Sequence, residues 1–184
     1  MRRQNMRVAA FAMVSIAAGG AEASERSAGR LFDVPRANLI PDSARPFFLP
    51  PSRDGFIFKL NPEAALPEQV IIGVESKADV CARAAGSHAR ANTTICNDHQ
   101  VKWRAPLQRS GDDTIWSYTA GEAGKTSVIV GCFKATNGGL CTSALPWRDQ
   151  VLNISFRDTE VAALPKLFDQ ATDLLARWER NGGR

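Results

Sequence analysis

Hydrophobic and polar positions follow their most regular pattern between residues 126 and 178. Residues 127–133 (SVIVGCF) form an almost uninterrupted β-branched run, which predicts a strand covered on both faces or central in an antiparallel sheet. Residues 151–156 (VLNISF) alternate, which predicts a strand with one face in the core. Asn137, Gly138 and Gly139 tolerate positive φ, so they predict a tight reversal after the first of these strands.

A helical period follows the second strand. Polar side chains fall opposite an apolar stripe, which consists of Leu164, Leu167, Phe168, Ala171, Leu174, Leu175 and Trp178. Pro165 suits the first position of a helix, where its missing N–H costs nothing. The pattern therefore predicts a helix from about Pro165, preceded by a lead-in turn over residues 158–163 and ended by the glycines at 182 and 183. We expect the stripe to pack on a sheet.

Shorter segments elsewhere indicate further strands. Alternating or apolar runs predict strands at residues 55–60 (GFIFKL), 68–74 (EQVIIGV), 93–96, 101–104 and 114–119 (TIWSYT), and a short helical turn at 79–85. Strands thus outnumber helices, and no strand–helix–strand alternation is present. We expect an α+β fold: a mainly antiparallel β-sheet packed by a C-terminal amphipathic α-helix.

Residues 1–23 are typical of a cleavable signal peptide. Arg2, Arg3 and Arg7 precede an apolar run at residues 8–18, and Ala-Glu-Ala ends at Ala23. We expect cleavage after Ala23. The run is too short to span a membrane, and no later segment approaches the ~20 apolar residues that a transmembrane helix requires.

The predicted domain organisation follows from composition. Prolines interrupt residues 24–53 at positions 35, 41, 46, 50 and 51, which predicts an extended or disordered arm. Residues 54–180 then form one α+β domain, and residues 181–184 form a flexible tail.

Four cysteines follow the predicted cleavage site. An even number in an oxidising compartment predicts two disulfides, and short loop closure favours Cys81–Cys96 and Cys132–Cys141. We therefore expect a periplasmic or secreted protein. A signal peptide followed by one small domain favours a bacterial periplasm.

The charge pattern argues against nucleic-acid binding. The formal net charge is +4, but three of the arginines that contribute to it lie in the predicted signal peptide. The other basic residues are scattered among acids without an aromatic-basic repeat.

Motifs for catalysis, metal binding and cofactors are weak. Residues 121–126 end like a phosphate-binding loop but lack its first glycine and the helix that should follow. His88 and His99 are the only histidines, neither cysteine pair has the spacing of a zinc site, and no Cys-x-x-Cys is present. We expect no metal and no cofactor. A hydrolase would have to use His99 with Asp98 or Asp112.

Two tryptophan–arginine pairs are the candidate partner-binding residues. Trp103 with Arg104 and Trp147 with Arg148 combine residue types that are enriched at interface hot spots. The leading hypothesis is a secreted or periplasmic binding protein of inhibitor or immunity type, which neutralises another secreted or periplasmic protein by steric occlusion. The alternatives are a small periplasmic hydrolase and an accessory or structural protein of the cell envelope.

Overall fold

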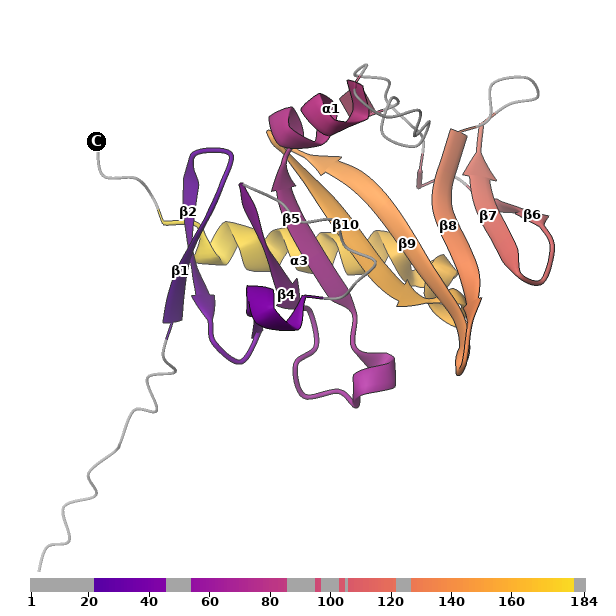
Figure 1. Cartoon of the computed structure of the whole chain (residues 1–184), viewed down its shortest axis with the longest axis horizontal. Helices are drawn as coiled ribbons and strands as arrows, with labels where there is room; N and C mark the ends of the chain where they lie inside the picture. Colours follow the sequence, from indigo (N-terminus) through magenta and orange to yellow (C-terminus); the bar gives the residue numbers. More distant parts are fainter. Residues whose placement is uncertain are drawn as a thin grey trace, which may run out of the picture.

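The computed structural model describes residues 22–45, 54–85, 95–96, 103–104, 106–121 and 127–180. One eight-stranded sheet dominates the fold, with the strand order β3-β4-β5-β10-β9-β8-β7-β6 and only antiparallel pairs (Figure 1). Its strands are β3 Leu39–Ile40, β4 Gly55–Lys59, β5 Ile71–Ser76, β6 Gln108–Gly111, β7 Ile115–Ala120, β8 Ser127–Ala135, β9 Gly138–Trp147 and β10 Gln150–Arg157.

The other elements are a separate hairpin and the helices. Strands β1 (Glu22–Ser27) and β2 (Arg30–Pro35) pair only with each other among the described strands. The α-helices are α1 (Lys77–Ala85) and α3 (Leu164–Trp178), and the 3₁₀ turns are η1 (Asp42–Ala44), η2 (Leu66–Glu68) and η3 (Asp158–Ala163). In this described part of the chain, no helix has both the length and the apolar content needed to cross a membrane.

The core lies between α3 and one face of the sheet. Leu152, Ile154 and Phe156 alternate along β10 and are fully buried or nearly so. Leu164 and Leu175 of α3 are also fully buried, and Figure 1 shows α3 running across the sheet. The predicted fold class, the amphipathic helix and its lead-in turn are confirmed.

The described residues cover the opposite face of the sheet only in part. Val80 of α1 and Ile95 pack against Val151, which points away from α3 because it alternates with Leu152 along β10. Ile40 and Ile57 form a second small cluster with Ile71 on strands β3 to β5. These contacts leave the end of the sheet around β6, β7 and β8 outside both clusters.

The first part of the predicted arm is folded, which corrects the expectation of an extended or disordered segment at residues 24–53. Phe32 and Val34 of β2 are fully buried in the main core. Phe32 and Val34 alternate toward the core and therefore favour a strand. Pro35 does not prevent this strand, because it is the last residue of β2. Residues 46–53, which contain the remaining three prolines, lie outside the described part.

Polar contacts also hold this hairpin to the domain. The buried amide of Gln150 donates to the carbonyl oxygen of Ser27 over 3.2 Å. The backbone N–H of Ala28 donates to Asp54 Oδ2 over 2.9 Å. The predicted boundary between an arm and a domain at residue 54 therefore has contacts across it. The other predicted boundaries, including cleavage after Ala23, stay predictions.

Two predicted strands are wrong where the structure describes them. Ile95 and Cys96 are helical, and Trp103 and Arg104 form a turn. Both predicted segments are only four residues long, and a run this short does not establish a strand. Conversely, β6 carries four exposed residues and has no apolar pattern that could have revealed it.

Candidate protein-binding surface

Both predicted disulfides are present. Cys81 of α1 pairs with Cys96, with their Cα atoms 5.6 Å apart. Cys132 and Cys141 lie directly opposite each other on β8 and β9, with their Cα atoms 4.0 Å apart. The second disulfide fixes the register of these two strands.

The first tryptophan–arginine pair is anchored on α3. The ring of Trp103 packs edge-on against Phe168, with 4.8 Å between centroids, and the Arg104 guanidinium lies 4.5 Å above the Trp103 ring. Arg104 also forms a two-point ion pair with Asp169, in which one N–O distance is 2.5 Å. The hydrogen bond from Arg104 lowers the pKa of Asp169.

The second pair lies near the other end of the helix. Arg148 stacks 4.6 Å above the Trp147 ring, and its Nη1 is 2.5 Å from Glu179 Oε2. Arg30 of β2 pairs with the other carboxylate oxygen of Glu179. Asp169 and Glu179 are ten residues apart, or about 15 Å along a helix, so the two pairs do not form one site. Their role in binding a partner stays a prediction.

A hollow of about 580 Å³ adjoins the first pair. Trp103 and Tyr118 line it from one side, and Val161 and Pro165 line it from η3 and α3. Arg104 and Asp158 place opposite charges at its wall. The first pair therefore stands at a mixed aromatic and charged cleft.

The residues considered for catalysis are not assembled into a site in the described structure. His88, His99 and Asp98 lie outside the described residues. Asp112 accepts hydrogen bonds from the backbone N–H groups of Ile115 and Thr114, over 2.9 Å and 2.7 Å, and these bonds lower its pKa. This is the geometry of a carboxylate that caps a turn. No cluster of three or more potential metal ligands occurs among the residues that the structure describes.

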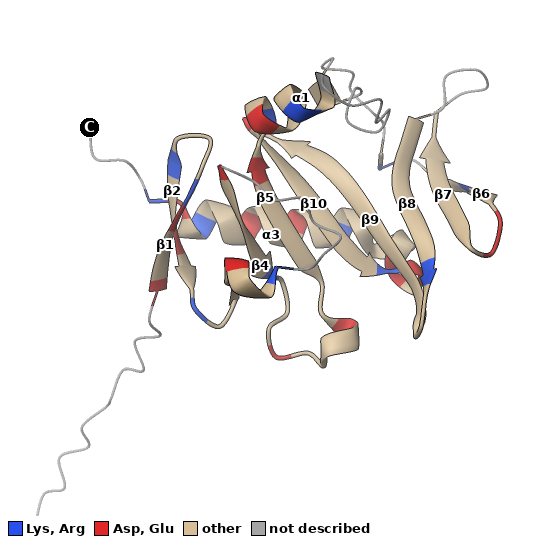
Figure 2. Cartoon of the chain, in the orientation of Figure 1, with Lys and Arg blue, Asp and Glu red and all other residues tan. Residues whose placement is uncertain are grey.

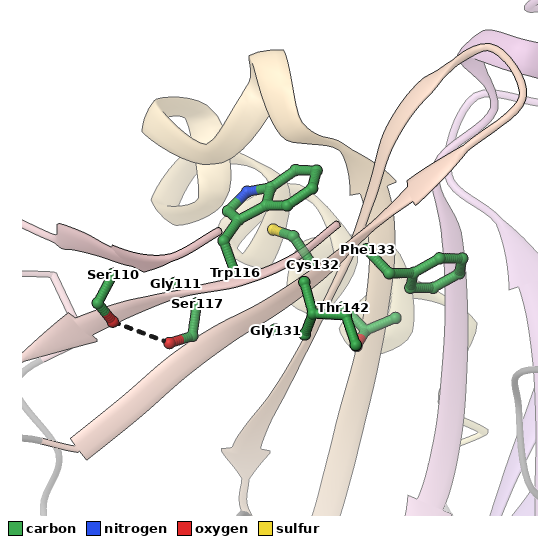
Figure 3. A pocket seen from close by; sticks show the side chains of 9 residues that line it. Ser110, Gly111, Trp116, Ser117, Gly131, Cys132, Phe133 and Thr142 are labelled. Carbon is green, nitrogen blue, oxygen red and sulfur yellow. Dashed lines mark hydrogen bonds between the residues drawn. The ribbon is translucent and has the colours of Figure 1, made fainter. Parts of the chain in front are cut away.

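A second hollow, of about 470 Å³, lies on the open end of the sheet (Figure 3). We call it the sheet groove, and its lining residues are Ser110, Gly111, Ile115, Trp116, Ser117, Gly131, Cys132, Phe133 and Thr142. Ser110, Ser117, Gly131 and Thr142 are consecutive cross-strand partners on β6, β7, β8 and β9. Their small side chains form a shallow row across four strands.

Large apolar side chains stand beside this row. Ile115 and Phe133 face each other across β7 and β8, and Ile115 is 68% exposed. Val128, three residues before Gly131 on β8, is 55% exposed but is not among the residues that line the groove. Among the described residues the only other large hydrophobic side chain with such exposure is Leu66 of η2. Sequence reasoning missed this surface, because the strand alternation of residues 114–119 does not tell which face is left uncovered.

Comparisons with known proteins indicate a fold. No protein-family model and no curated protein match the sequence. A solved structure that this chain resembles is that of an immunity protein of the Stenotrophomonas maltophilia type IV secretion system. The likeness covers 88% of this chain and 94% of that chain, with a TM-score of 0.50 and 11% sequence identity. At this identity the likeness shows a shared fold.

Proposed function

We propose that the protein is an immunity-type binding protein, which neutralises a secreted or periplasmic partner protein by covering its functional surface. The observation that carries the proposal is the fold likeness to an immunity protein, because it extends over most of both chains. Function does not follow from fold alone, so features of this chain must support it independently.

Two such features agree with the proposal. The two disulfides suit an oxidising compartment, in which a secreted toxin or hydrolase would be met. Ile115 is exposed and lies opposite Phe133 at one end of the described sheet, and clustered apolar side chains on a surface often mark a protein-binding site. We include export by cleavage after Ala23 in the proposal.

Neutralisation in cells tests the function directly. Each secreted toxin or hydrolase candidate encoded near the gene is expressed in the periplasm of a bacterial host, with or without the full-length chain. We expect one candidate to stop growth when expressed alone and to be tolerated when the chain is present. Isothermal titration of that purified candidate with the mature protein should then show a one-to-one complex.

A chain without residues 1–23 provides the matched control. It retains the whole described domain except for Glu22 and Ala23 at the start of β1. If the partner acts outside the cytoplasm, this variant should fail to protect cells although its purified, oxidised form binds the same partner. Loss of growth in every pairing with the full-length chain would contradict the proposed function.

A further inference from the structure

We infer that the sheet groove is the docking site for the partner, and that the docking segment is uncharged, apolar and extended. The inference rests on the proposed function, because it names the surface and the partner chemistry through which occlusion would occur.

The floor admits close approach of another chain. Gly131 has no side chain, and a Cβ atom built there would meet no atom within 4 Å. Its cross-strand neighbours Ser117 and Thr142 are small. Figure 3 shows the Ser110 and Ser117 hydroxyls directed toward each other, and their oxygens are 3.2 Å apart. These hydroxyls can also bond the backbone of an extended segment, since each has both a donor and acceptor positions.

The wall supplies apolar contact area. Ile115 and Phe133 are cross-strand partners and line the same hollow, so an apolar side chain laid over Gly131 would bury part of both. Ile115 is 68% exposed, and nothing in the described structure covers it. Apolar surface of this kind favours association when it is removed from water.

The absence of charge in the groove indicates that the partner's docking segment is uncharged. None of the lining residues is charged. Strands β7 and β9 contain no charged residue, and Lys134 is the single one on β8 (Figure 2). Lys134 alternates with Phe133 on β8, and Arg109 alternates with Ser110 on β6 and lies over the ring of Trp116, which is buried in the main core. A charged segment would therefore lose hydration in the groove without gaining an opposite charge.

A disulfide lies beneath the groove and makes it rigid. The Cys132–Cys141 disulfide fixes β8 and β9 beneath it, which reduces the ordering cost of binding. Strand β6 ends the described sheet, and all four of its residues are exposed. The row from Ser110 to Thr142 crosses four strands, and three strand spacings amount to about 14 Å, so an extended segment of about four residues can lie across the sheet face over Gly131.

The test uses a phage-displayed library of random linear peptides. The library is selected on the mature wild-type protein with both disulfides formed and without counter-selection, and the Kd of each enriched peptide is then measured for wild type and for Gly131→Arg. We expect the enriched peptides to be apolar and uncharged, and Gly131→Arg to weaken their Kd by about tenfold or more. Thermal melting should confirm that Gly131→Arg is folded, because the space above Gly131 is open.

Two further variants keep the test decisive. Ile115→Asp changes an exposed side chain at the wall, so it tests the groove even if Gly131→Arg fails to fold. It should weaken the same peptides about tenfold. Leu66→Asp is the matched control, since it makes the same kind of change at an 81% exposed position on η2 and should leave Kd unchanged.

The outcomes separate this inference from the proposed function. Peptides that bind wild-type and both groove variants equally, or that are charged, would overturn the inference. So would full protection by folded Gly131→Arg against a toxin that the wild-type chain neutralises, and in that case the proposed function would stand. A third outcome is that apolar peptides bind in a groove-dependent way but the chain neutralises no toxin. This result would support the groove as a site for apolar segments and would overturn the proposed immunity function.

Discussion

At the scale of single residues, Gly131 and Gly139 lie on adjacent strands but differ in the space available for a side chain. A Cβ atom at Gly139 would be 2.6 Å from Trp116 Cζ2 and 2.6 Å from Asp158 Cγ, whereas at Gly131 it would meet nothing. We expect Gly139→Ala to lower the free energy of unfolding by about 1–3 kcal/mol, as overpacking does. Gly131→Ala should change it by no more than about 0.5 kcal/mol. Urea unfolding of both variants checks the contrast, and equal costs would contradict it.

A second prediction at this scale concerns pH and Glu179. Burial raises the pKa of Glu179, but hydrogen bonds from Arg30 and Arg148 outweigh burial and hold the pKa below its ordinary value. A carboxylate with a lowered folded-state pKa stabilises the protein above the ordinary pKa of 4.5 that it has in the unfolded chain, and this contribution is lost as the pH falls through the folded-state pKa. We expect Glu179→Gln to cost about 1 kcal/mol at pH 7, the upper range for partly exposed ion pairs.

The difference between wild type and Glu179→Gln should therefore shrink as the pH falls below about 4.5. Chemical unfolding at neutral and acidic pH measures it. Asp113→Asn is a suitable control, because the Asp113 side chain is 99% exposed and its ion pair with Arg109 is 3.5 Å long. A difference that grows toward acid would show that the carboxylate is not held in its charged form by the two arginines.

At the scale of elements, the N-terminal hairpin is part of the core. Phe32 is fully buried, and its ring lies 5.4 Å from that of Phe56 on β4. We expect Phe32→Ala to lower the free energy of unfolding by about 3–5 kcal/mol, the usual cost of truncating a buried aromatic side chain. Arg26→Ala, at an exposed position of the same hairpin, should have little effect. Similar melting temperatures for the two variants would instead support a dispensable arm.

The elements that could be predicted from the sequence are those with a long, regular period. Strands β8 and β10 and helix α3 have such periods, and both disulfides close short loops. The hairpin was missed because its inward-facing apolar signal is only Phe32 and Val34 before a proline. Strand β6 was missed because Gln, Arg, Ser and Gly carry no apolar alternation.

The sheet groove could not be predicted for a different physical reason. Its floor depends on the register that brings Ser117, Gly131 and Thr142 together from three strands. Each of these residues is unremarkable in its own segment. The sequence pattern did single out Trp103 and Trp147, but the structure places their arginines in ion pairs with α3 and its C-terminal end. Their role in binding a partner stays a prediction, because these ion pairs neither require nor exclude it.

At the scale of the whole molecule, the stability of the fold depends on whether the two disulfides are oxidised. Cys81–Cys96 and Cys132–Cys141 close sequence separations of 15 and 9 residues. Loop-closure entropy assigns them about 3 and about 2.6 kcal/mol, which together are comparable with the total stability of many domains. We expect reduction to lower the melting temperature by roughly 10–20 °C, given the usual shift per kcal/mol for a chain of this size.

The final prediction separates the two crosslinks. Calorimetry of oxidised and reduced wild type should be compared with the double variants Cys81→Ala with Cys96→Ala and Cys132→Ala with Cys141→Ala. Cys132 and Cys141 are buried in the core beneath the sheet groove, so their loss also removes packed sulfur atoms. We therefore expect the second double variant to melt lower than the first, although its loop is shorter. The opposite order would show that loop closure outweighs core packing here, and unchanged melting on reduction would contradict a stabilising role for either disulfide.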